Sequence, residues 1–313
     1  DEIGNGASIR RARFAVKAQV TRNWYGEFDI DMADGTAELK DAILRYDGIK
    51  NVEIQVGNFK ENFSMQRNTS SRYLQFMERP MVTYLAPSRH LGANIKYSIP
   101  LIWASAGIFF QEIAGLEEVT NVQDNNKDYG RGTGESYTGK LVLRPLHKYN
   151  DMGLHIGGAV SYRTPKSTDA PSDFGGVRYS ARNSTSSNRK KYVDTDVIKG
   201  VDHSLLYTAE LAGHYKGLRV ETAYIGSTVS LKDDSPMVNK DNKNFGGWYA
   251  QAGYLLFGGQ QRYDYGGAKY NRVQRGQKWG DLELTARYES IDLNDFDGGV
   301  YGGASEAYAL GMN

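Results

Sequence analysis

A basic, hydroxyl-rich stretch, SMQRNTSSRYLQFMERP, occupies residues 64–80. Arg67 and Arg79 could each donate two parallel hydrogen bonds to an oxyanion, and the hydroxyls of Ser70 and Ser71 could donate one each. Backbone amides at the start of a short helix would add further donors. These residue types together predict a site for a tetrahedral oxyanion. For any one arginine, a solvated, salt-bridged loop is an equally good interpretation.

The same stretch carries a helical pattern. Tyr73, Phe76 and Met77 recur at helical spacing, which predicts a short helix from about residue 71 to 79, capped by Ser70 or Ser71. An amphipathic helix inside a loop could bury its apolar side against the rest of the protein and present its cations and hydroxyls elsewhere.

The rest of the chain alternates apolar and polar residues, which is typical of β-strands. In residues 13–20, Phe14, Val16 and Val20 are apolar, while Arg13 and Lys17 between them are charged. This pattern recurs along the chain and predicts about thirteen strands of roughly 8–13 residues. The apolar faces often end in aromatic residues: Tyr97, Tyr137, Tyr162, Tyr224, Trp248, Tyr254 and Tyr288. Together they predict an all-β, transmembrane, antiparallel up-and-down β-barrel. A soluble sandwich or propeller is disfavoured, because nearly every strand carries charge on its other face.

Composition excludes several classes of protein. The chain has no cysteine, so disulfide scaffolds, thiol catalysis and thiolate metal sites are excluded. A formal net charge of +1 argues against a nucleic-acid partner. The chain has no apolar run long enough for a transmembrane helix. Its five histidines share no ligand spacing, so we expect neither a metal site nor a cofactor.

Two motif matches are interpreted as chance. GESYTGK at 134–140 lacks the Ser or Thr that a P-loop requires next, and it lies inside an alternating stretch. DIDMADG at 29–35 has one residue too many before its glycine for a calcium loop, so Asp29 and Asp31 are expected to point into a polar lumen.

Loop lengths support the barrel. Short connections follow residues 21, 47, 99 and 214, and long polar ones occupy about 59–90, 113–136, 164–202 and 231–244. This alternation is typical of periplasmic turns and external loops. Residues 258–280 are an exception, because they are long on the nominally short side. An odd number of strands cannot close such a barrel, so at least one strand is expected outside this sequence.

Cations also gather on the first strand. Arg11, Arg13 and Lys17 share its polar face, whereas Arg10 has the opposite parity. Asp41 has the parity of Arg45 on the third strand and could moderate anion binding, because conduction requires sites weak enough to release the ion.

The segments IRRARF, WYGEFDIDMADG, AELKDAILRYDG, VGNFKENFSMQRNTSSRYLQFMERP and RPLHKYNDMGLHIGGAVSYR resemble the phosphate-selective porins of the O and P family. The resemblance extends over nearly the whole chain and is most specific from residue 9 to 80. It implies a trimeric outer-membrane barrel of roughly sixteen strands, with one strand before residue 1 and about two after residue 313. A single domain, 1–313, would then carry an inward-folded constriction loop at 59–90.

The resemblance also implies roles for individual residues. Arg10 and Arg11 match paired pore arginines, Asp41 a constriction carboxylate, Ser70 and Ser71 phosphate-contacting serines, and Arg79 a constriction arginine. Arg67 stands where the family has a lysine, and Arg178 and Arg182 fall loosely on an arginine ladder. The anion-binding set is therefore Arg10, Arg11, Arg67, Ser70, Ser71 and Arg79, and Arg13, Lys17, Asp41, Arg178 and Arg182 line the pore.

The sequence therefore predicts an anion-selective porin for passive uptake of phosphate or a similar oxyanion. Its surroundings would be the lipid and lipopolysaccharide of a Gram-negative outer membrane, and it would be a homotrimer. The alternative is a structural or accessory barrel in a larger envelope complex. A lipid-hydrolysing barrel enzyme would need a serine and a histidine together on the outer wall, and loop serines disfavour it.

Overall fold

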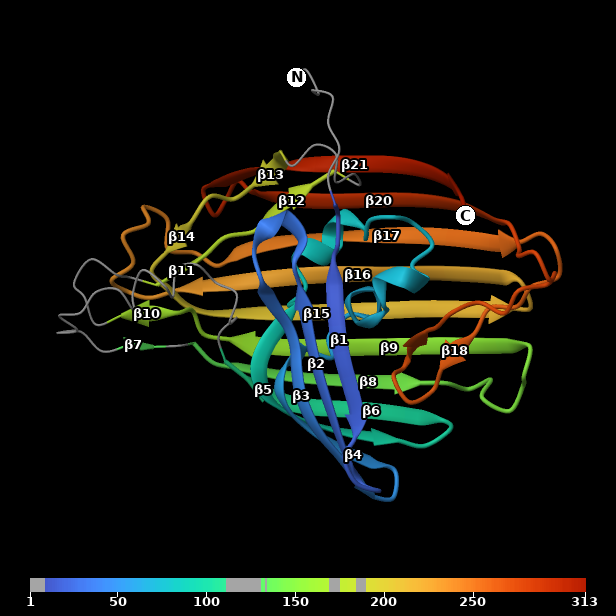
Figure 1. The fold of residues 1–313 in the computed structure, drawn as a ribbon. Helices are drawn as coiled ribbons and strands as arrows, with labels where there is room; N and C mark the ends of the chain where they lie inside the picture. The colour runs from blue at the N-terminus through green and yellow to red at the C-terminus, as the bar shows by residue number, and fades with distance from the viewer. Residues whose placement is uncertain (1–8, 111–130, 133, 169–174, 184–189) are drawn as a thin grey trace.

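The computed structural model describes residues 9–110, 131–132, 134–168, 175–183 and 190–313. Most of the described residues form one large antiparallel sheet (Figure 1). It consists of β1 (Arg13–Gln19), β2 (Trp24–Asp31), β3 (Glu38–Ile49), β4 (Val52–Lys60), β5 (Arg89–Ser98), β6 (Ile102–Phe109), β8 (Ser136–Leu143), β9 (Met152–Arg163), β15 (Val201–Tyr215), β16 (Leu218–Leu231), β17 (Lys243–Leu255), β20 (Glu283–Asp295) and β21 (Val300–Met312). Each predicted strand overlaps one strand of this sheet. The end of the expected strand at 100–112 lies outside the described residues.

Shorter elements lie in the connections. β7 (Arg131–Gly132) pairs with β10 (Ser167–Thr168), β11 (Gly176–Val177) with β14 (Ile198–Lys199), β12 (Ser180–Arg182) with β13 (Lys191–Asp194), and β18 (Tyr263–Asp264) with β19 (Lys269–Tyr270). The helical turns are η1 (Ala33–Gly35), α1 (Met65–Asn68), η2 (Ser71–Tyr73) and η3 (Met81–Tyr84). No helix in the described ranges is long and apolar enough to cross a membrane.

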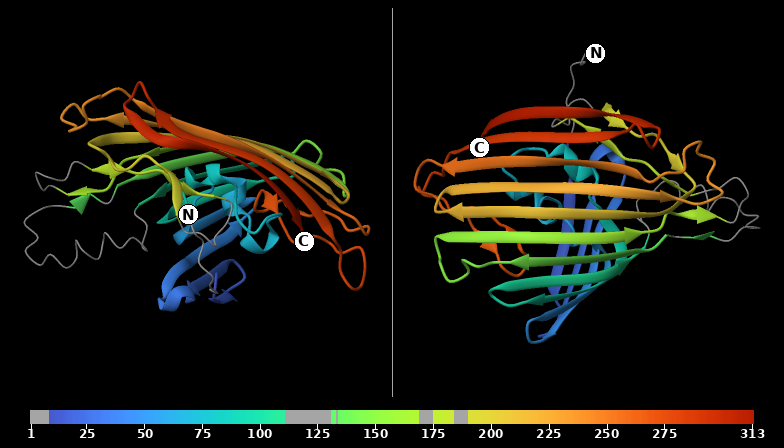
Figure 2. Two further views of the ribbon diagram at one scale, coloured as in Figure 1. Left: turned by 90° about the horizontal axis from the view of Figure 1, so that it is seen from above. Right: turned by 180° about the vertical axis from the view of Figure 1, so that it is seen from behind.

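Every strand of the large sheet pairs with the next one along the chain. This confirms the predicted antiparallel up-and-down order. β1 and β21 are the two edges and do not pair with each other among the described residues, so a closed barrel and a count of sixteen strands remain predictions. The sheet curls, and its first strands face the concave side of its later strands (Figure 2).

The two faces of the sheet have opposite chemistry. Along β15, Leu205, Tyr207 and Leu211 are exposed on the convex side, while Thr208 and Glu210 are buried on the concave side. This is the reverse of a soluble sheet, in which apolar residues face inward. It is the pattern expected when lipid covers the outside of a barrel.

Tight turns close the hairpins at one end of the sheet. Asn51 and Lys216 have left-handed backbone conformations, with φ of 64° and 49°, in the turns that join β3 to β4 and β15 to β16. Two-residue hairpin turns require such φ values. The connection of residues 256–282 lies at the same end but is long, which agrees with the exception seen in the sequence.

The predicted helix from 71 to 79 is wrong. Helical structure in this segment consists of η2, and Leu74 has an extended backbone with ψ of 148°. Pro80 disfavours the helical region for Arg79, and the side chain of Gln75 is bonded to Glu283 of the sheet. Met77 is 87% exposed, so the helical spacing of Tyr73, Phe76 and Met77 marks no buried face.

The exposed convex face generates a stability prediction. Leu211 lies on it between Tyr207 and Tyr215, so Leu211→Arg should destabilise the protein in lipid by about 2–4 kcal/mol. The matched control is Val238→Arg, at a fully exposed position between β16 and β17, where no effect is expected. Urea unfolding in lipid bilayers measures both. Equal stability of the two variants would contradict a lipid-facing convex side.

Candidate functional site

Residues 61–88, which join β4 to β5, are called the inner loop here. They lie against the concave face of the sheet, between its early and its late strands (Figure 2). Phe63, Met81, Val82 and Leu85 are almost fully buried in one cluster with apolar residues of the later strands, including Ile225. The hydrophobic effect therefore holds this loop inside the curl of the sheet.

Carboxylates on the concave face bind the backbone of the inner loop. Glu210 on β15 accepts a hydrogen bond from the amide of Met65 at 2.5 Å, and Glu289 on β20 accepts one from the amide of Met81, also at 2.5 Å. Hydrogen bonds to ionised acceptors are the strong ones, and water is excluded here. These two amides therefore position α1 and η3.

Side-chain amides make a second set of anchors. Gln66 donates to Glu221 on β16 at 2.6 Å, and Gln75 donates to Glu283 on β20 at 2.9 Å. All four side chains are buried. Gln66 precedes η2 and Gln75 follows it, so these two bonds fix the middle of the inner loop.

Glu61 anchors the beginning of the inner loop. Its carboxylate contacts Arg163 at 2.9 Å and His90 at 2.8 Å, and it accepts a hydrogen bond from the hydroxyl of Thr138 at 2.6 Å. Burial alone would raise its pKa. The charge of Arg163, with the His90 bond and charge and the hydroxyl of Thr138, outweighs burial and lowers the pKa to about 2.

Arg67 and Arg79 shape the turn that carries them. Arg79 donates through Nε to the carbonyl of Gln66 at 2.7 Å and through Nη2 to that of Thr69 at 2.8 Å, so it spans the end of α1. Arg67 donates through Nε to the carbonyl of Thr83 at 2.8 Å. The two guanidinium groups therefore bridge α1 to the second half of the inner loop.

Further cations surround Arg79. Lys60, at the end of β4, donates to the carbonyl of Arg67 at 2.7 Å, and Arg11 is close enough to influence Arg79 electrostatically. Burial, together with the charges of Arg67 and Arg11, lowers the pKa of Arg79 to about 9. Burial is the larger cause, and the neighbouring positive charges of Arg67 and Arg11 act in the same direction.

The nearby carboxylates have other cationic partners. Asp41 on β3 forms a two-pronged ion pair with Arg89 on β5, at 2.9 and 2.7 Å. Glu78 contacts Arg10 at 3.1 Å. For Arg11, Lys60 and Arg79, no ion pair with a carboxylate is found in the described part of the chain. The structure thus concentrates uncompensated cations at the inner loop.

The predicted serines lie at η2, beside this cluster. Ser70 caps η2 by accepting a hydrogen bond from the amide of Arg72 at 3.5 Å, and Ser71 begins the turn. Both side chains are partly exposed. The predicted capping role is therefore filled by Ser70, on a shorter turn than expected.

Other predicted pore residues lie away from the inner loop. Arg13 pairs with Asp31 at 3.1 Å and Lys17 with Glu27 at 2.5 Å, both between β1 and β2. Asp31 is buried, and its parity on β2 is opposite to that of the exposed Phe28. These pairs neutralise the charges of the first strand.

Arg178 and Arg182 belong to the segment around the β12–β13 hairpin. Arg178 is held by Asp194 at 2.6 Å, and this pairing raises its pKa, the hydrogen bond that it donates to Asp194 being the largest cause. Arg182 ends β12, a strand that contacts η3 of the inner loop. The β12–β13 hairpin therefore contacts the inner loop. Arg178 pairs with Asp194 of this hairpin and not with a residue of the inner loop.

Sequence reasoning missed Lys60 and Arg89, and it also missed the carboxylates Glu210, Glu221 and Glu289 as anchors. Strand parity places the three carboxylates on the polar face. Their partners could not be found, because a strand pattern does not reveal which loop folds over it.

Comparisons with known proteins agree with this geometry. The family described as "Phosphate-selective porin O and P" matches residues 2–313. An uncharacterized protein of Caulobacter vibrioides is 27% identical over 320 residues, which cover 99% of this chain and 60% of that protein. Porin O of Pseudomonas aeruginosa is 22% identical over 313 residues, covering 93% of this chain and 67% of its own. The chain thus spans about three fifths of the first relative.

Among solved structures, the outer-membrane expressed OmpT of Vibrio cholerae shares the fold. It matches with a TM-score of 0.51 and 14% identity, covering 96% of this chain and 73% of that one. The antiparallel meander and the apolar convex face agree with this likeness, which defines the fold as that of an outer-membrane type of β-sheet protein. More specifically, the chain belongs to the phosphate-selective porin O and P family, whose place is the outer membrane of a Gram-negative bacterium.

The Glu61 anchor predicts a pH dependence. Its pKa falls from an ordinary 4.5 to about 2 on folding, so its contribution is complete above pH 4.5 and is lost as the pH falls towards 2. Glu61→Gln should ease opening of the inner loop by about 3 kcal/mol at pH 7. Hydrogen exchange of peptides from residues 61–88, corrected for intrinsic rates, measures this.

The difference between wild type and Glu61→Gln should shrink below pH 4.5 and vanish near pH 2. Glu38→Gln, at a half-exposed carboxylate, is the matched control and should behave as wild type. A difference that stays constant down to pH 2 would show that the carboxylate charge does not hold the loop.

Proposed function

We propose that this porin is an anion-selective channel for the passive uptake of phosphate or a similar oxyanion, and that the inner loop forms its constriction. The observation that carries the proposal is the group Arg11, Lys60 and Arg79, for which the described residues provide no carboxylate partner. Burial and neighbouring positive charge lower the pKa of Arg79, and an anion would remove that repulsion.

The size of the electrostatic attraction suits an anion that binds at the constriction and is then released. One cation about 4 Å from an anion contributes around 4 kcal/mol at an effective dielectric constant of 20, before desolvation. Several such cations would hold an anion too tightly for rapid flux. Asp41 and Glu78 lie within the same group and reduce the net field through their pairs with Arg89 and Arg10.

Each predicted site residue receives a role in this proposal. Arg10, Arg11, Arg67 and Arg79 provide charge at the constriction, and Ser70 and Ser71 provide hydroxyl donors beside it. Lys60 is an addition from the structure. The residues that would line the approaches are Arg13, Lys17, Asp41, Arg178 and Arg182. As the family resemblance implies, we further propose a closed barrel of roughly sixteen strands, assembled as a homotrimer in lipid and lipopolysaccharide.

Reversal of charge on the inner loop tests the selectivity. We expect the double variant Arg67→Glu and Arg79→Glu to lose anion preference and become cation-selective, because local charge sets which ion enters. Single-channel reversal potentials in a salt gradient measure the preference. The matched control is Arg22→Glu with Lys50→Glu, the same charge change at exposed turns.

The control should keep its anion preference. A wild-type channel that prefers cations, or a double variant with unchanged selectivity, would overturn the proposal. Complete absence of conductance together with stoichiometric co-purifying proteins would instead favour a structural barrel in a larger envelope complex.

The Asp41–Arg89 pair generates a separate prediction. Asp41→Asn keeps the side-chain shape but frees the charge of Arg89, so phosphate should bind more tightly, by about tenfold. Channel conductance should then saturate at a lower phosphate concentration, with a lower maximum. Asp47→Asn, in an exposed position near the β3–β4 turn, is the control. An unchanged saturation curve for Asp41→Asn would remove this residue from the site.

A further inference from the structure

The long connection at the short-turn end, residues 256–282 between β17 and β20, folds back onto the concave face. It is called the return loop here. The indole of Trp103 donates to the carbonyl of Gly266 at 2.9 Å, and the hydroxyl of Tyr263 is 2.7 Å from Nδ1 of His155. Gln261 donates to Glu283 at 2.9 Å. These bonds hold the return loop against the concave face. It enters from the short-turn end of the sheet, whereas the inner loop enters from the opposite end.

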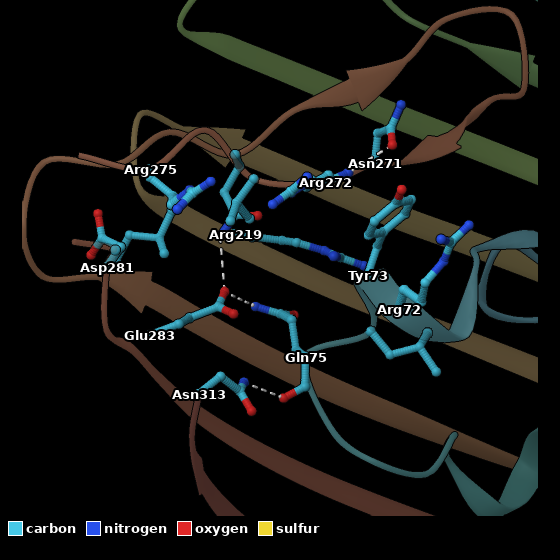
Figure 3. Close-up of a pocket in the computed structure, with 15 residues that line it drawn as sticks. Arg72, Tyr73, Gln75, Arg219, Asn271, Arg272, Arg275, Asp281, Glu283 and Asn313 are labelled. Atoms are coloured by element: carbon cyan, nitrogen blue, oxygen red, sulfur yellow. Dashed lines mark hydrogen bonds between the residues drawn. The ribbon is translucent and has the colours of Figure 1, made fainter. Parts of the chain in front are cut away.

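A pocket of about 360 Å³ lies where these two loops meet. Its walls are residues 72–75 of the inner loop, residues 271–275 and 280–281 of the return loop, and the adjoining ends of β16, β17 and β20 (Figure 3). This volume falls in the range of sites for small organic ligands, and it is several times larger than an orthophosphate ion.

Three arginines give the pocket a positive charge. Arg72, Arg272 and Arg275 line it and are exposed, and none has an ion pair among the residues that the structure describes. A fourth, Arg219, is buried and bound to Glu221 at 2.5 Å. Arg72 extends away from the other two exposed arginines in Figure 3, which leaves the guanidinium groups of Arg272 and Arg275 to bind one incoming anion.

The two carboxylates of the pocket are already engaged. Asp281 accepts backbone hydrogen bonds from Phe257, Gly259, Gly276 and Leu282, at 2.8–3.0 Å. Burial alone would raise its pKa, and these backbone bonds lower it instead. Glu283 accepts from the amides of Gln75 and Gln261. Neither carboxylate is paired with Arg72, Arg272 or Arg275.

The pocket also has an apolar side. The ring of Tyr73 and the side chains of Leu74, Leu255 and Val273 line it together with the arginines. A fully hydrated inorganic ion makes no use of such surface, whereas a ring attached to an anionic group could pack on Tyr73. The combination of a cationic side and an apolar side favours an organic anion over a simple one.

We propose that this pocket binds a phosphomonoester with a ring-containing organic part, its phosphate held by Arg272 and Arg275 and its ring packed against Tyr73. The site is distinct from the cations around Arg79. It would let the channel hold an organic phosphate at its short-turn end.

Calorimetric titration of the purified protein with phenyl phosphate tests this site. Phenyl phosphate should bind more tightly than orthophosphate or phenol, and Arg272→Gln with Arg275→Gln should weaken it at least about tenfold. The matched control is Arg262→Gln with Lys278→Gln, on the same loop but outside the pocket lining. Tyr73→Leu should weaken phenyl phosphate more than methyl phosphate, and this comparison isolates packing on the ring.

The pocket variants should keep the wild-type reversal potential, so this test is independent of the proposed selectivity. The inference is overturned if phenyl phosphate binds no more tightly than orthophosphate. It is also overturned if the pocket variants bind as wild type while Arg67→Glu with Arg79→Glu abolishes binding, because the constriction would then be the site.

Discussion

The requirement that buried polar groups be paired governs this structure. The convex face is apolar, so the polar half of each strand turns inward, where an unpaired charge would cost several kcal/mol. On the concave face Glu210 is matched by Lys140 at 2.6 Å, and Glu289 by Arg287 at 3.3 Å. Each carboxylate also accepts an amide of the inner loop. These two carboxylates therefore neutralise cations of the sheet and also position the inner loop.

The ion pairs on the sheet contrast with the inner loop, where the described residues provide no carboxylate partner for Arg11, Lys60 and Arg79. Where the loop is anchored, four carboxylates each have a cationic partner: Glu61, Glu210, Glu221 and Glu289. Around Arg79, in contrast, the available carboxylates Asp41 and Glu78 are engaged by Arg89 and Arg10. The anion site proposed above would account for the excess of positive charge around Arg79, because a bound anion would supply the missing partner.

Two loops from opposite ends share the interior. The inner loop is held by apolar side chains and carboxylates, and the return loop by Trp103, His155 and Glu283. Neither depends on regular helix: α1 has four residues, and the other turns in the inner loop are 3₁₀. Tertiary hydrogen bonds replace the intrahelical ones that these segments lack, which explains how a largely irregular chain can be ordered on the concave face of the sheet.

The sequence by itself determined the strands, their order and the polar parity of residues such as Asp31 and His155, because alternation is a local property with a period of two. It also predicted that Arg67 and Arg79 belong to one segment, the proposed anion site. The helix expected at 71–79 failed, since Pro80 and the bond from Gln75 to Glu283 outweigh helical spacing. Only the tertiary structure decided that Lys60 joins the cation group, and that residues 72–75 and the return loop line one pocket. Such meetings depend on how distant segments fold together, and nothing in local periodicity encodes that.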